Sequence, residues 1–152
     1  MYKCSFNNVE ELKKFLECTD FEEVKFCVDP DYIEAVIGFT DYGKLVYDYE
    51  KMIEHLAKIY MEEGNCDDPY TDAVEWIEYN ADIPYWEIVY TDEETLEPEY
   101  GQLKKQLNKY PNIIIGLNTH GSLLIDASLI NNQNMEEIRK ILSACDIECL
   151  LA

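Results

Sequence analysis

The stretch that decides the fold is "VIGFTDYGKLVYD", which runs from Val36 to Asp48. An apolar run is followed by turn-forming residues and then by a second apolar run. This pattern predicts a β-hairpin that turns near Asp41 to Gly43. Asp48 closes the second run, and aspartate is a preferred residue for capping the start of a helix. The stretch therefore predicts a hairpin that leads directly into a helix.

A second stretch, "IIGLNTHGSLLID" from Ile114 to Asp126, aligns with the first one without a gap. The two stretches share an Ile, two Gly, a Leu and an Asp at equivalent places. Because both glycines keep their spacing, residues 36–48 and 114–126 form a candidate internal pseudo-repeat of hairpin–helix units. The alternative is that two hairpins meet the same packing demands independently. That alternative is favoured for the helical segments "VEELKKFLECTD" (Val9–Asp20) and "MEEIRKILSACD" (Met135–Asp146), which also match.

Strands and helices alternate along the rest of the chain. Asn8, Asp48 and Asp68 are candidate helix caps, and Gly64 is a stop signal for the helix that follows Asp48. We expect an α+β fold in which helices pack against a mixed or antiparallel sheet, within one domain over residues 1–152. Further strands are expected within 2–6, 22–28 and 85–90, a helix from Pro98 to Pro111, and a final helix and short strand after Asp126.

Charge is distributed unevenly along the chain. The net charge is −20, yet residues 59–103 hold 14 Asp and Glu with no Lys, Arg or His, whereas residues 104–152 hold five of each sign. The acidic stretch also contains eight Tyr and Trp residues, which a solvated linker would not need. We therefore predict an acidic helical insert at about residues 59–103. It is either an ordinary solvated surface or a surface for a positively charged partner.

Spacing favours the second interpretation for the helix after Asp68. Asp72, Glu75, Glu78 and Asp82 recur every three or four residues, which corresponds to steps of about 4.5–6 Å along a helix. Duplex DNA carries a phosphate about every 3.4 Å along each strand. The four carboxylates can therefore imitate part of a phosphate ladder. Trp76 falls on the apolar face of the same helix and is expected to pack in the core.

Several classes of function lack their sequence signals. The six glycines form no phosphate-binding loop, and neither the six cysteines nor the two histidines have the spacing of a zinc site, so no metal or cofactor is expected. Only 12 residues are basic, which disfavours direct binding to nucleic acid. Without a signal peptide or a membrane-spanning run, we expect reduced thiols and a place in a bacterial cytosol. An enzyme is not expected, although a small cytosolic enzyme that uses a Cys stays open as an alternative.

The segments "AVIGFTDYGKLVYDYEKMIEHL", "DAVEWIEYN" and "PYW", within Ala35–Trp86, resemble a broad group of small acidic proteins of Firmicutes and their phages. The pattern of that group is roughly A-I-I-G, a D-G turn, V-V-Y-D-Y-D-K-M-I-E, E-A-x-E-W-I-D-Y-N and P-Y. The group usually has a stretch with basic residues before P-Y, whereas "NADIPYW" is shorter and acidic. The group has no settled biochemical function, so the resemblance implies a phage or mobile-element context and no catalytic residues.

By analogy of size and charge with known phage inhibitors, the expected function is an anti-CRISPR protein that presents a DNA-mimicking surface to a host nuclease. An anti-restriction protein comes second. An immunity protein or antitoxin against a basic toxin nuclease is an alternative, and a homodimer is left open. The expected partner is a basic nucleic-acid-binding protein, not nucleic acid or a membrane. The expected partner-binding residues are Glu62, Glu63, Asp67, Asp68, Asp72, Glu75, Glu78, Tyr79, Asp82, Tyr85, Trp86, Glu87, Asp92, Glu93 and Glu94.

Overall fold

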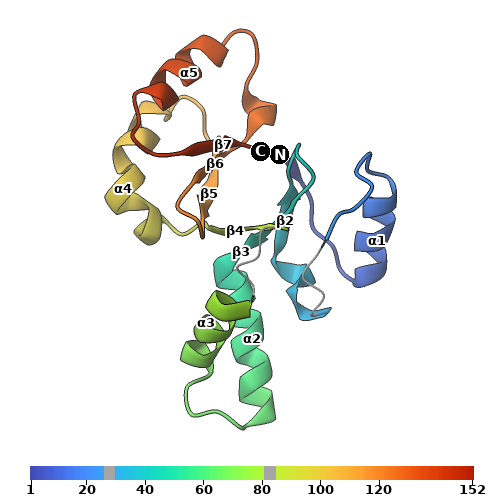
Figure 1. Ribbon diagram of the computed structural model, residues 1–152. Coiled ribbons are helices and arrows are strands. Elements are labelled where there is room, and N and C mark those ends of the chain that lie inside the picture. The colour runs from blue at the N-terminus through green and yellow to red at the C-terminus, as the bar shows by residue number, and fades with distance from the viewer. Residues whose placement is uncertain (26–29, 81–84) are drawn as a thin grey trace.

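Seven short strands form one curled sheet in the computed structural model, which describes residues 1–25, 30–80 and 85–152, without the side chains of residues 30, 31, 93, 95 and 97–99. The strands follow one another in the sheet in chain order. Neighbours are antiparallel except for β3 with β4 and β6 with β7, which are parallel. The expected α+β fold with a mixed sheet is therefore confirmed (Figure 1). The strands are β1 (Tyr2–Lys3), β2 (Val36–Phe39), β3 (Leu45–Asp48), β4 (Glu87–Tyr90), β5 (Ile114–Asn118), β6 (Leu123–Ile125) and β7 (Cys149–Leu151).

The helices begin mostly where the capping residues predict. Asn8 accepts a hydrogen bond from the backbone N–H of Glu11 at the start of α1, and Asp48 accepts one from that of Lys51 at the start of α2. Gly64 ends α2 in the left-handed conformation, with φ of 67°. The α-helices are α1 (Val9–Glu17), α2 (Tyr49–Glu63), α3 (Pro69–Asn80), α4 (Glu93–Gln106) and α5 (Met135–Ser143), and short 3₁₀ turns cover Pro30–Ala35 (η1) and Ala127–Leu129 (η2).

Two predicted elements differ from the structure. The helix expected to begin at Pro98 begins at Glu93 instead, because Asp92 precedes its first turn and its carbonyl accepts a hydrogen bond from the Leu96 N–H at 3.2 Å. Pro98 therefore lies inside α4. The strand expected over 22–28 is not formed by residues 22–25, and the remainder of that prediction lies outside the described residues.

The two hairpins of the candidate pseudo-repeat have the same register. Each is interrupted at the same place, between Val36 and Gly38 in β2 and between Ile114 and Gly116 in β5. In each hairpin a backbone N–H donates to a carbonyl across the turn, from Thr40 to Lys44 and from Asn118 to Ser122. Both turns carry a glycine at φ of 86°, a conformation that favours glycine. The equivalent glycines are Gly43 and Gly121.

The repeat extends beyond the hairpins. In both halves the hairpin leads through a helical segment to a strand that pairs in parallel with the second hairpin strand, which gives β2–β3–α2–β4 and β5–β6–α5–β7. The helix α3 has no counterpart between β6 and β7, a segment that is described throughout. The similar sequences of α1 and α5 occupy non-equivalent places, α1 before its hairpin and α5 after its own. Shared amphipathic packing, rather than duplication, therefore explains that likeness.

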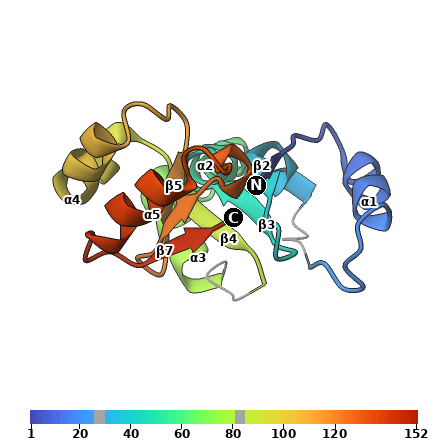
Figure 2. The ribbon, with the colours of Figure 1, turned by 90° about the horizontal axis from the view of Figure 1, so that it is seen from above.

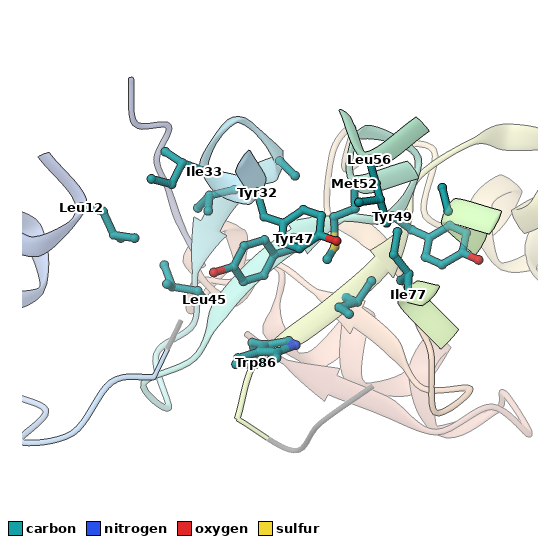
Figure 3. Close-up of a cluster of buried hydrophobic side chains, with 14 of the residues drawn as sticks. Leu12, Tyr32, Ile33, Leu45, Tyr47, Tyr49, Met52, Leu56, Ile77 and Trp86 are labelled. Atoms are coloured by element: carbon teal, nitrogen blue, oxygen red, sulfur yellow. The ribbon is translucent and has the colours of Figure 1, made fainter. Parts of the chain in front are cut away.

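Side chains alternate between the two faces of the sheet, as the two-residue period of strands requires. On one face, helices cover two clusters; Figure 3 shows the first, where Leu12 of α1 lies on the side of Leu45 and Met52 of α2 lies beside Tyr47. On the other face a third cluster brings Met1 and Ala152 together with residues of the central strands. The helices α1 and α4 lie at opposite ends of the sheet (Figure 2).

A buried ion pair fastens the two ends of the chain to the sheet. The α-ammonium of Met1 donates to Asp126 Oδ1 at 2.8 Å and also to the carbonyl of Ala152. The side chains of Met1 and Asp126 are each only 2% exposed. Asp126 also accepts hydrogen bonds from the N–H and the hydroxyl of Ser128. Because these groups favour its charged form despite the cost of burial, the pKa of Asp126 is below its usual value.

Candidate protein-binding surface

The helices α2 and α3 form a hairpin that projects from the sheet (Figure 1). Gly64 ends the first helix, and Asp68 starts the second by accepting hydrogen bonds from the N–H and the hydroxyl of Thr71. These bonds lower the pKa of the Asp68 carboxyl. Ala73 and Ile77 face inward and are buried, so the other faces of α3 are left to solvent.

Carboxylates dominate the outer part of this hairpin. Residues 60–80 hold seven Asp and Glu and no basic residue. None of the seven takes part in the ion pairs found among the described residues. Asp72 is half-buried, and the other six are exposed: Glu62, Glu63, Asp67, Asp68, Glu75 and Glu78. The structure therefore brings together most of the predicted partner-binding residues on one projection, which we call the acidic hairpin (residues 60–80).

A shallow, open groove of about 600 Å³ runs along the acidic hairpin. Aromatic rings and carboxylates line it together. Tyr79, one of the expected partner-binding residues, is 90% exposed. Trp76 lines the groove while its ring also lies 6.0 Å from that of Tyr32 between centroids, so it serves both the core and the surface. The groove is lined by Tyr60, Glu63, Asn65, Cys66, Asp72, Glu75, Trp76, Tyr79 and Asn80.

Two predicted surface residues are buried and require correction. Trp86 is 8% exposed and packs in the first cluster, where its ring meets Tyr47. Glu87 is 4% exposed because β4 is a central strand of the sheet, not part of an insert. Its carboxylate bonds to Asn118 Nδ2 at 3.0 Å and to the Tyr42 hydroxyl at 3.3 Å. Glu87 therefore joins the turns of the two hairpins, and burial beside this carboxylate raises the pKa of Tyr42.

The remaining predicted residues are not part of the acidic hairpin. Tyr85 is 47% exposed at the start of β4, and Glu94 is exposed on α4. Asp92 is half-buried at the junction of β4 and α4. Asp82 and the side chain of Glu93 lie outside the described residues. The acidic stretch of 59–103 is thus divided among a projecting hairpin, the central strand β4 and the helix α4, which precedes the second repeat.

A second group of carboxyls lies at the base of α2. Burial raises the pKa of Glu50 to about 7, and a hydrogen bond with the carboxyl of Asp92 and the charge of Asp48 act in the same direction. Asp48 in turn accepts a hydrogen bond from the hydroxyl of Thr91 at 3.0 Å. The group connects the β3–α2 junction to the β4–α4 junction, and sequence spacing does not reveal it because these two junctions are more than 40 residues apart.

Replacing Glu50 by glutamine should stabilise the protein at pH 8 and leave it nearly unchanged at pH 5. Because the folded pKa is raised to about 7, this group favours folding below its ordinary pKa and loses that contribution as the pH rises through 7. Glutamine keeps a donor for Asp92 without the charge. Since Glu50 is partly exposed, we expect a gain of only about 1 kcal/mol at pH 8, measured by urea unfolding.

The exposed Glu54 on the same helix provides the control. The Glu54→Gln variant should leave the difference in stability between pH 5 and pH 8 as it is in the original protein. Equal effects of the Glu50 and Glu54 substitutions would contradict the proton-sharing arrangement at the base of α2.

Burial disfavours thiolate formation at two of the described cysteines, Cys4 and Cys149. Cys4, Cys18, Cys66, Cys145 and Cys149 form no disulfide with one another. Burial raises the pKa of Cys4 to about 11 and also raises that of Cys149, which disfavours the reactive thiolate. No cluster of His, Cys, Asp or Glu with the geometry of a metal site occurs among the described residues.

The groove itself was only partly predictable. Glu63, Asp72, Glu75 and Tyr79 follow from the acidic pattern, whereas Tyr60, which also lines the groove, is not among the expected partner-binding residues. In the described ranges no helix has both the length and the apolar composition needed to cross a bilayer. Comparison of the chain with protein-family models, with curated proteins and with solved structures finds no match.

Proposed function

We propose that the protein is a non-enzymatic inhibitor that inserts its acidic hairpin into the nucleic-acid site of a basic host nuclease. A CRISPR nuclease is the first candidate target and a restriction enzyme the second. The resemblance over Ala35–Trp86, which implies a phage or mobile-element context, supports this choice of targets. The observation that carries the proposal is the concentration of seven carboxylates without a basic residue over 60–80, on a projecting hairpin.

The geometry of α3 supports mimicry of a phosphate backbone. Asp72, Glu75 and Glu78 rise along the helix in steps of about 4.5 Å, and Asp68 precedes its first residue as the cap. Three of the four side chains are exposed, and Asp72 is half-buried. Asp68 takes the place of Asp82, which lies outside the described residues, in this ladder. A basic groove that binds phosphates can therefore meet several carboxylates of one rigid helix.

Energetics explain why such a surface points to a partner. Two like charges about 8 Å apart repel by roughly 0.5 kcal/mol in water, and among the described residues none of the seven carboxylates of the acidic hairpin has an ion-pair partner. A fold can tolerate a cost of that size. The return comes on binding, because a concentrated negative field speeds encounter with a basic cleft, by up to about a thousandfold at low salt.

The test is competition between the protein and DNA. The tagged protein is used to capture partners from a lysate of phage-susceptible bacteria, with and without excess duplex DNA, and the captured proteins are identified by mass spectrometry. The proposal expects a nucleic-acid enzyme that duplex DNA displaces. Capture of one partner that DNA leaves in place would contradict mimicry and favour an immunity protein.

Charge reversal on the acidic hairpin should weaken this capture at least tenfold. The variant combines Glu62→Lys, Glu75→Lys and Glu78→Lys, all at exposed positions. It removes local negative charge without touching the buried face of either helix, so the fold should persist, as circular dichroism can verify. Affinity for the captured partner is measured at two salt concentrations, because electrostatic binding weakens as salt increases.

A matched control changes the total charge by the same amount elsewhere. Glu10→Lys, Glu22→Lys and Glu136→Lys are exposed and lie outside the acidic hairpin. If both triple variants weaken binding equally, net charge rather than the hairpin drives the interaction, and the proposal is wrong. In cells, the protein should also restore plaque formation by a phage that the nuclease restricts, and the hairpin variant should not.

A further inference from the structure

The groove on the acidic hairpin combines two kinds of surface that are rarely found together on a merely solvated helix pair. Tyr79 exposes 90% of its surface, a large aromatic area that contributes little to the core. Three rings and three carboxylates line the same hollow of about 600 Å³. The rings belong to Tyr60, Trp76 and Tyr79, and the carboxylates to Glu63, Asp72 and Glu75.

This combination matches one side chain better than any other. The guanidinium of arginine is planar and stacks on aromatic faces, while its fork of N–H donors bonds to carboxylates. We propose that the groove binds an arginine side chain of the partner protein and anchors the complex there. The inference rests on the proposed function, in which the partner presents a basic surface, and it adds where and how one basic residue is recognised.

Other occupants fit the groove less well. Phosphates and nucleotides are repelled by Glu63, Asp72 and Glu75. An apolar ligand would leave these carboxylates desolvated without partners, which is costly. A lysine satisfies the charges but lacks the plane that stacks on the rings. The described residues hold no cluster suited to a metal ion.

The chain does not supply the arginine itself. Its single arginine, Arg139, is exposed on α5, which lies on the opposite side of the sheet region from the acidic hairpin in Figure 1. The Lys25 ammonium lies 4.0 Å from the centroid of the Tyr85 ring, outside the groove. That contact shows that this protein already pairs a cation with an aromatic ring elsewhere. In the groove the cation must come from another molecule.

The test uses short peptides as probes, namely hexa-arginine, hexa-lysine and hexa-citrulline. Citrulline keeps the shape of arginine without the charge. Binding is followed through tryptophan fluorescence, since Trp76 lines the groove whereas Trp86 is buried. Hexa-arginine should bind at least fivefold more tightly than hexa-lysine and change the emission, and hexa-citrulline should not bind. Equal affinities for the arginine and lysine peptides would overturn the inference.

Matched variants locate the site. Tyr79→Ala and Glu75→Gln alter the groove, whereas Tyr70→Ala and Glu54→Gln remove an exposed ring and an exposed charge outside its lining. Each groove variant should weaken hexa-arginine binding at least threefold, and the control variants should not. If all four variants behave alike, the peptide binds by diffuse charge attraction and the inference is wrong.

The outcome is separable from that of the proposed function. If DNA displaces a captured nuclease but the Tyr79→Ala variant binds that nuclease as tightly as the original protein, the arginine anchor is wrong and DNA mimicry still stands. If the protein binds hexa-arginine selectively but captures no partner that DNA displaces, the groove is still a cation site and the nuclease proposal is wrong.

Discussion

Replacing Asp126 by alanine should lower the free energy of unfolding by about 3–5 kcal/mol, because a buried ammonium then loses its counter-ion. Asp126 is 1% exposed and bonds to the α-ammonium of Met1 and to Ser128. The lowered pKa of Asp126 sets the sign of the pH effect: its contribution is present above the usual carboxyl pKa and is lost as the pH falls through the folded value. Urea unfolding at pH 7 and in acid measures both effects.

The pseudo-repeat provides the matched control. Asp48 is the equivalent of Asp126, and its side chain also accepts from a backbone N–H, that of Lys51, and from a hydroxyl, that of Thr91. No ammonium pairs with it among the described residues. Asp48→Ala should therefore cost only about 1–2 kcal/mol, the value of a lost helix cap. If the two substitutions cost the same, the buried ion pair is not what makes Asp126 important.

Replacing Gly116 by alanine should cost about 3 kcal/mol, the upper end of the range for overpacking. The new Cβ would lie 2.5 Å from the carbonyl oxygen of Tyr90 and 3.1 Å from the Cβ of Val89. Both atoms belong to β4, a central strand of the sheet that cannot yield without separating from β5. The thermal midpoint and the urea midpoint should both fall.

Gly38 tests whether the backbone clash is the cause. It occupies the same irregular position in the first hairpin, but there the new Cβ would meet the Sδ of Met1 at 2.5 Å, in a flexible side chain. Gly38→Ala should therefore cost clearly less than Gly116→Ala. A larger loss for Gly38→Ala would contradict this ranking.

The parts of the fold that sequence reveals are those with local chemistry. Turns and helix caps depend on residues within a few positions, so their sequence patterns predict them. Examples are the turns at Gly43 and Gly121 and the caps at Asn8 and Asp48. The start of α4 is harder to predict, because Pro98 carries a strong helix-start signal although Asp92 precedes the actual first turn.

The candidate site is likewise predictable from sequence only where it depends on local spacing. The carboxylates of α3 follow from helical spacing, and the structure places them on one projection. Glu87 does not follow, because what draws this carboxylate inward is Asn118 and Tyr42, which come from distant parts of the chain. A count of acidic residues over 59–103 treats Glu87 and Glu75 alike, although Glu87 joins the two repeats and Glu75 lines the groove.

The order of the strands has a consequence for how the chain folds. Each strand pairs with the strands next to it in sequence. No connection between paired strands therefore has to cross over a third strand of the sheet. Only the two hairpins pair segments that are close in sequence, because the parallel pairs join Val46 to Glu87 and Leu123 to Cys149. We therefore expect the hairpins to form before the parallel pairs, whose loop closure costs more entropy. Each repeat carries its own hairpin as a local nucleus, and α3 has no equivalent in the second. The helix α3, which carries part of the acidic hairpin, is therefore an addition to the unit that the two repeats share.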